Sequence, residues 1–178
     1  MTSLTAFTIL VALVALERLA ELVVSNRNAA WSFARGGRET GQGHYRFMVV
    51  LHSGFLVAML VEAWELRPDV KSTLAWTMLA LVVASQALRW WCIATLGRRW
   101  NTRVIIVPGL PPVTSGPYRF LSHPNYVAVV VEGFALPLVH GAWITALVFT
   151  VANAALLAVR IRVENAALRT LPGRYADA

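Results

Sequence analysis

The residues best suited to chemistry in this sequence lie at 114–126, where a polar, proline-marked segment comes directly before an apolar run. Gly116-Pro117 breaks the chain, and Pro124 has the fixed φ that suits the first turn of a helix. We therefore expect a helix from about residue 125. Its N-terminus presents free backbone N–H groups and the positive end of its dipole, which can hold a carboxylate or phosphate of a small ligand at a membrane surface.

Long apolar runs surround this segment and indicate an integral membrane protein. Hydrophobic residues make up 57% of the 178 and charged residues only 14%, well below the level of about a quarter in soluble domains. Runs of about 20 apolar residues can cross a bilayer. We predict an all-α fold in one membrane domain, 1–178. Its expected parts are five transmembrane helices at about 3–24, 46–65, 72–95, 125–141 and 143–162, a cofactor loop at 96–124 and a tail at 163–178.

The distribution of basic residues predicts the orientation of these spans. Of the 16 Lys and Arg residues, all but Arg67 and Lys71 fall on one side of the predicted spans, counting Arg18 near the end of the first span. The positive-inside rule then gives an outside N-terminus and a cytoplasmic C-terminus, in what we expect to be a bacterial cytoplasmic membrane. Topology also explains the net charge of +7, so nucleic acid is not an expected partner.

Three acidic residues within the predicted spans are candidates for function, because ionisable groups in a membrane are costly and usually face protein or water. Glu17 and Glu21 lie four residues apart, on one face of the first span. They either pair with loop arginines at the interface or face a ligand. Glu132 lies well inside the fourth span, where the alternative to a functional role is an ion pair with Arg89 or Arg160.

Two histidines in and just before the second predicted span are further candidates. His44 stands at the start of the helix, as suited to a structural as to a functional role, and His52 lies about two turns into the membrane. The alternative for His52 is a hydrogen bond to another span, for example to Gln86 or Asn153. Cys92 is the one cysteine, which excludes an intramolecular disulfide and a cysteine-based zinc cluster, and no metal site is predicted.

The proline-marked segment resembles the Gly-Pro-Tyr-Arg…His-Pro-x-Tyr signature of the isoprenylcysteine carboxyl methyltransferase family, small membrane enzymes that use S-adenosylmethionine. The resemblance extends to Leu-Gly-Arg-Arg-Trp at 96–100 and Arg-Ile-Arg-Val-Glu at 160–164. The N-terminal half is similar to a bacterial branch that O-methylates long-chain alkylpyrones and alkylresorcinols. Two residues depart from the pattern: Ser122 replaces the usual Arg, and Asn165 stands where many members have a second Glu.

The resemblance implies S-adenosylmethionine as the cofactor and a lipophilic substrate that enters from the bilayer. Glu164 suits a ribose or an ammonium, and a tyrosine can stack on the cofactor. The expected cofactor-binding residues are Tyr118, His123, Pro124, Asn125, Tyr126, Arg160 and Glu164. The expected substrate-binding residues are Glu17, His44 and Trp100. Besides membrane lipid, no obligate protein partner is predicted.

The methyl acceptor decides whether the reaction needs a base. A phenol or enol is a better nucleophile once deprotonated, so a histidine or carboxylate base becomes useful. His52, Glu21 and Glu132 are the candidate catalytic residues for this task. The favoured acceptor is the hydroxyl of an alkylpyrone or alkylresorcinol. The alternatives are a prenylcysteine carboxylate, a phospholipid amine, and a different class altogether, a small non-enzymatic membrane transport or assembly protein.

Overall fold

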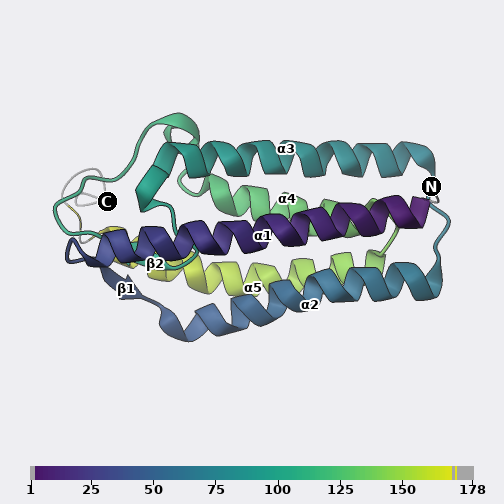
Figure 1. Cartoon of the computed structure of the whole chain (residues 1–178), viewed down its shortest axis with the longest axis horizontal. Coiled ribbons are helices and arrows are strands. Elements are labelled where there is room, and N and C mark those ends of the chain that lie inside the picture. The colour runs from purple at the N-terminus through teal and green to yellow at the C-terminus, as the bar shows by residue number, and fades with distance from the viewer. Residues whose placement is uncertain (1–2, 170, 172–178) are drawn as a thin grey trace.

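The computed structural model describes residues 3–169 and 171, and this part of the chain forms a bundle of five long helices (Figure 1). The helices are α1 (Ser3–Phe33), α2 (Gln42–Leu66), α3 (Ser72–Leu96), α4 (Pro124–Leu138) and α5 (Trp143–Leu168). Each coincides with one predicted apolar run, so the predicted all-α fold is confirmed. Residues 170 and 172–178 of the predicted tail lie outside the described residues.

Several helices have the length and composition of membrane spans. Within the described residues these are α2, α5, and α3 together with the short helix η1 (Gly97–Arg99); α4 is a shorter apolar helix. Large apolar side chains such as Phe47, Val50 and Trp76 are at least 70% exposed on the outside of the bundle. An outer surface of this kind is suited to lipid, so the helices indicate an integral membrane protein.

Successive helices run in alternating directions, which sorts the connections between two ends of the bundle (Figure 1). The α2–α3 connection lies at the same end as the N-terminus. The end of α1, the α3–α4 connection and the end of α5 gather at the other end, which we call the ribbon end because it holds β1 and β2. The loop at 96–124 and the last turns of α5 therefore lie close together, as the predicted topology requires.

A short antiparallel ribbon at this end was not predicted. It pairs β1 (Arg38–Thr40) with β2 (Val104–Ile106), so that Arg38 lies opposite Ile106. The strands come from connections far apart in sequence, and no local pattern of three residues could have indicated their pairing. Another short helix, η2 (Gly116–Arg119), follows in the same connection as β2.

Polar contacts explain why α1 continues past the predicted end at residue 24. The Ser25 hydroxyl lies 2.9 Å from Asn101 Oδ1 and 2.8 Å from Thr102 Oγ1. One turn later, Asn28 Nδ2 donates to the carbonyl of Trp100 at 2.8 Å. The polar extension of α1 therefore holds the segment after η1 in place.

The apolar core occupies the half of the bundle away from the ribbon end, where Phe7, Val11, Phe55, Met59 and Leu136 are buried together. The other half contains buried ionisable groups. Its centre is Glu21, which accepts hydrogen bonds from Arg89 Nε at 2.6 Å, Arg89 Nη2 at 2.8 Å and Arg18 Nη1 at 2.9 Å. Arg18 also lies 3.6 Å from Glu132.

This network differs from the pairings considered from sequence. Glu132 pairs with Arg18 of α1 rather than with Arg89 or Arg160. Glu17 accepts hydrogen bonds from Arg18 Nη2 at 3.0 Å and from the indole N–H of Trp90 at 2.7 Å, and is also bonded by Gln86. The partners of these carboxylates lie on helices rather than on loops, because a charge buried in the bundle must be paired by a group beside it.

Candidate active site

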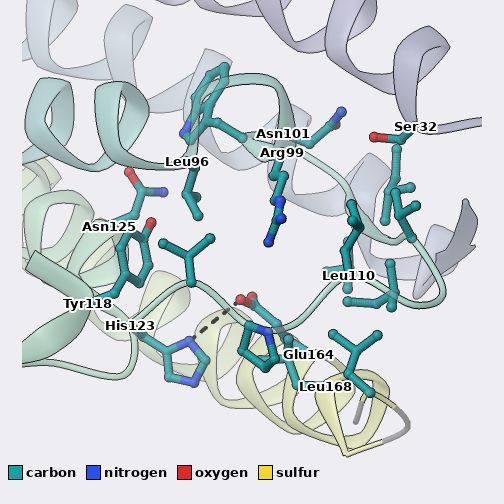
Figure 2. A pocket seen from close by; sticks show the side chains of 18 of the residues that line it. Ser32, Leu96, Arg99, Asn101, Leu110, Tyr118, His123, Asn125, Glu164 and Leu168 are labelled. Carbon is teal, nitrogen blue, oxygen red and sulfur yellow. Dashed lines mark ion pairs between the residues drawn. The ribbon is translucent and has the colours of Figure 1, made fainter. Parts of the chain in front are cut away.

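Two cavities lie one behind the other at the ribbon end. The first, of about 170 Å³, is walled by the α3–α4 connection, the start of α4 and the end of α5. Among the residues lining it are Tyr118, His123, Asn125 and Glu164, whose side chains are seen around the cavity in Figure 2. The wall thus joins segments that are distant in sequence and were predicted to act together.

The second cavity, of about 200 Å³, lies inside the bundle, with walls from α1, α2, α4 and α5. All three predicted catalytic residues, Glu21, His52 and Glu132, line it. Most of its remaining wall is apolar, with Phe55 and Phe149 among the contributors. It therefore combines space for an apolar ligand with a small set of ionisable groups.

The two cavities share a wall. Five residues line both of them: Trp100, Asn101, Asn125, Tyr126 and Arg160. The two cavities therefore adjoin, and ligands in them would contact the same side chains. We call this set the shared wall.

Arg160 is the most constrained member of the shared wall. Its guanidinium is buried and donates from Nε to the Tyr126 hydroxyl at 2.8 Å and from Nη2 to the Thr102 carbonyl at 2.7 Å. Nη1 lies 3.0 Å from the sulfur of Met48. Because these contacts reach α2, α4 and the segment before β2, Arg160 fixes the positions of three parts of the chain at once.

Tyr126 links Arg160 to the first cavity. Its hydroxyl accepts from Arg160 and donates to the Glu164 carboxylate. Arg160 and Glu164 lie one helical turn apart on α5, so the tyrosine bridges two groups on the same face. The predicted cofactor residues Tyr126, Arg160 and Glu164 thus form one connected chain.

His123, at the N-terminus of α4, completes this chain of contacts. Its ring stacks on Tyr126 with 5.2 Å between ring centroids, and its Nδ1 lies 3.7 Å from Glu164 Oε1 (dashed in Figure 2). Nε2 lies 2.9 Å from Asn165 Oδ1, so Asn165, one of the two departures from the family pattern, provides a partner for the histidine. A ring that faces an acceptor on each side is suited to be doubly protonated.

The electrostatics agree with that geometry. The hydrogen bond with Glu164 raises the pKa of His123 above its ordinary value, assisted by the Glu164 charge and by Asn165, while partial burial opposes the rise. Burial raises the pKa of the Tyr118 phenol, so this side chain stays neutral. The first cavity therefore offers a carboxylate, a histidine inclined to be cationic and a neutral aromatic ring.

The start of α4 departs from one expectation. The backbone N–H groups of Tyr126 and Val127 donate to the carbonyl of His123 at 3.1 and 3.4 Å, so they are not free to bind an anion. Pro124 is fully buried at the first turn and does not line either cavity. An anion in this cavity would therefore depend on side chains more than on the helix N-terminus.

His52 has a different partner from those considered for it. Its Nδ1 lies 2.9 Å from the carbonyl of Met48, while Glu21 and Gln86 are engaged by the arginine network. A carbonyl can only accept, so Nδ1 carries the proton and Nε2 has the free lone pair of a neutral imidazole. The ring stands edge-on to Phe149 at 5.2 Å, which fixes its orientation.

Several buried polar atoms that line the cavities have no hydrogen-bond partner among the described residues. They are Trp100 Nε1, Asn125 Oδ1, Asn153 Oδ1, Arg18 Nε and Glu132 Oε2, the last of which is near Arg18. Buried polar groups are normally satisfied, and a group of them along one cavity wall is typical of a ligand site. Trp100 and Asn125 belong to the shared wall, where a ligand on either side could reach them.

Two predicted substrate residues lie outside both cavity linings. Glu17 belongs to the arginine network, and His44 packs near Gly41 at the beginning of α2. Conversely, Asn101 and Asn153 line a cavity without having been predicted as site residues. The sequence feature that could have indicated Asn153 is that it is a polar residue in the middle of an apolar run.

Comparison with known proteins bears on the same region of the chain. The sequence profile of the isoprenylcysteine carboxyl methyltransferase (ICMT) family matches residues 78–170, which span α3 to the end of α5. The chain belongs to the ICMT family. It is also similar to the uncharacterized protein YpbQ of Bacillus subtilis (strain 168), with 35% identity over 164 residues that cover 92% of this chain and 96% of YpbQ.

A second relative, an uncharacterized protein of Haemophilus influenzae, is 28% identical over 155 residues, covering 86% of this chain and 90% of that protein. No solved structure matches. Membership of the ICMT family implies methyltransferase activity in a membrane, and members of the family use S-adenosylmethionine as methyl donor. The matched region contains nearly the whole wall of the first cavity, whereas α1 and α2, which line the second, precede it.

The charge of His123 gives a first test of the site in this ICMT-family protein. We predict that His123 titrates above the ordinary histidine value of about 6.5 and that Glu164→Gln moves its pKa down, because the neutral amide no longer favours the charged imidazolium as the carboxylate does. Histidine-selective NMR in micelles measures this, with the His123 signal assigned by its absence in a His123→Gln variant.

A raised pKa of His123 also makes the stability of the fold depend on pH. The stabilisation from the His123–Glu164 interaction is fully present below about pH 6.5 and is lost as the pH rises through the pKa of His123 in the folded protein. An unchanged titration in Glu164→Gln contradicts the assignment.

Proposed function

We propose that this protein transfers a methyl group from S-adenosylmethionine, bound in the first cavity, to the hydroxyl of a long-chain alkylpyrone or alkylresorcinol in the second. The observation that carries the proposal is the shared wall. Methyl transfer is an in-line displacement, so catalysis depends on holding donor and acceptor against each other in fixed orientation. Two adjoining cavities that are lined by the same few side chains supply that arrangement.

The residues of the first cavity match the polar groups of S-adenosylmethionine. Glu164 can hold the ammonium, and a cationic His123 can face the carboxylate. The unpartnered Asn125 and Trp100 atoms provide an acceptor and a donor beside them. When bound, the cofactor supplies an electrophilic methyl on a sulfonium; the residues named here bind and orient it.

The second cavity supports a hydroxyl acceptor. His52 lines the cavity, and in its neutral form the Nε2 atom has a free lone pair that can accept the proton of a phenol or enol. The three arginines of this cavity have partners: Arg18 and Arg89 are paired with Glu21, and Arg160 donates to Tyr126 and Thr102. Apart from Arg18 Nε, a carboxylate acceptor would have to compete for these contacts, whereas a hydroxyl would not.

Cofactor binding tests the first half of the proposal. We predict that His123→Ala and Glu164→Ala each weaken the binding of S-adenosylhomocysteine by about tenfold or more, the effect of losing one charge-assisted contact. Calorimetry of the detergent-purified protein measures this. The control Glu65→Ala removes an exposed carboxylate near the opposite end of α2 and should bind as the wild type does. Wild-type affinity in both site variants would refute the cofactor assignment.

The proposal also requires the ribbon end to face the cytoplasm, where the cofactor is made. We propose five spans with an outside N-terminus in a bacterial cytoplasmic membrane, and predict that Arg38→Cys is labelled from the cytoplasmic side and Asp69→Cys from outside. Both positions are exposed, at opposite ends of the bundle, and the native Cys92 is fully buried. Labelling of both from one side contradicts this topology.

The role of His52 tests the acceptor half. In a lipid-extract assay with labelled methyl donor, we predict that His52→Ala loses about 100-fold or more of its activity toward alkylresorcinol, the usual range for a general base. Its affinity for S-adenosylhomocysteine should barely change, because His52 lines only the second cavity. The defect should shrink at high pH, where the phenol ionises unaided. Full activity at neutral pH, or methylation only of prenylcysteine acids or phospholipid amines, would overturn the hydroxyl-acceptor mechanism.

A further inference from the structure

The second cavity extends well beyond the shared wall. Arg160 lies at the shared wall and Asn153 comes seven residues earlier on α5, and both line the cavity. Seven residues are two helical turns, about 10 Å along the axis. Tyr126 and Gly133 on α4 line the cavity with the same spacing. We call the part lined by Glu132, Gly133, Phe149 and Asn153 the inner end.

No hydrogen bond among the described residues explains the buried polar side chain of Asn153 at the inner end. It is 2% exposed, and its amide oxygen has no hydrogen-bond partner among the described residues. The neighbours on its own helix that line the cavity, Phe149, Leu156 and Leu157, are apolar. An amide buried in such surroundings is unfavourable unless something in the cavity bonds to it.

The packing beside Asn153 is arranged around an aromatic ring. Phe149 lies edge-on to His52 and 4.0 Å, between centroids, from Phe55. It also lies over Gly133, where an added Cβ would come within 2.2 Å of its ring. Gly133 therefore makes room for this ring on the face of α4, one turn of α5 before Asn153.

The side of the second cavity between α1 and α2 is suited to be the exit of an alkyl chain. Leu22 on α1 and Val49 on α2 line the cavity and are 37% and 44% exposed. A chain leaving between α1 and α2 would enter lipid directly. The polar ring of an acceptor would then lie inside, with the shared wall on one side and the inner end on another.

We infer that the inner end is a second polar subsite, in which Asn153 hydrogen-bonds a hydroxyl of the acceptor other than the one that is methylated. This inference rests on the proposed function. A carboxamide is neutral and both donates and accepts, so a hydroxyl, which does the same, satisfies it best. Of the acceptors proposed above, the preferred ones are therefore alkylresorcinols, whose ring has two hydroxyl groups, in preference to rings with one, among them the alkyl-substituted hydroxypyrones.

The test compares two acceptors of equal chain length, a 5-alkylresorcinol and a 3-alkylphenol. The wild-type protein should methylate the resorcinol with a kcat/KM about three- to tenfold higher, the contribution of one hydrogen bond. Asn153→Leu should reduce this preference to near unity by lowering kcat/KM for the resorcinol and leaving that for the phenol. Its affinity for S-adenosylhomocysteine should equal that of the wild type, which also shows that the variant is folded.

Thr150→Val is the matched control. Thr150 lies one turn earlier on α5, outside both cavity linings, with its hydroxyl bonded to the carbonyl of Ala146 at 2.6 Å, and the wild-type preference should persist in this variant. Should Asn153→Leu fail to fold, Asn153→Ala makes the same comparison, because alanine also removes the amide. A preference retained in the Asn153 variant of an active protein overturns the inference alone. Failure of the wild type to methylate either compound overturns the proposed acceptor class and the inference with it.

Discussion

Charges buried in an apolar bundle must find partners inside it, and this constraint organises the half of the molecule that contains both cavities. Glu21 receives three hydrogen bonds from two arginines, and Arg18 extends the network to Glu132 on α4. Removing one partner of such a network leaves an uncompensated charge, which typically costs about 3–5 kcal/mol. The position of α1 against α3 and α4 is therefore set by polar contacts, whereas apolar packing dominates the other half of the bundle, where Glu62 also bonds the start of α5.

Polar contacts also position the loop that carries part of the shared wall. The polar extension of α1 bonds the loop through Ser25 and Asn28, and Arg160 binds the Thr102 carbonyl from the side of α5. Trp100 and Asn101 stand between these anchors. Residues outside the apolar spans thus determine where the boundary between the cavities lies, and the family match includes this loop but not α1.

Helices were predictable from sequence because apolar runs of sufficient length leave few alternatives in a membrane. The proximity of His123, Tyr126, Arg160 and Glu164 was expected from the resemblance and is present in the structure. The partners of the buried polar groups were harder to predict: Arg18 rather than Arg89 or Arg160 pairs with Glu132, and Met48 rather than Gln86 or Asn153 bonds His52. The Arg18–Glu132 pair and the β1–β2 ribbon join residues from distant parts of the chain, which local sequence patterns do not reveal, whereas Met48 lies one turn before His52 on the same helix.

The members of the shared wall differ in how firmly they are held, and this difference has a consequence for catalysis. Arg160 makes two hydrogen bonds and a sulfur contact, so its guanidinium is a fixed point. Trp100 Nε1 and Asn125 Oδ1 have no hydrogen-bond partner among the described residues and border both cavities. A ligand in either cavity can satisfy them, and in doing so orients side chains that the other ligand touches. In the proposed reaction, we expect the binding of donor and acceptor to be coupled through these two atoms, with Arg160 as a fixed point beside both sites.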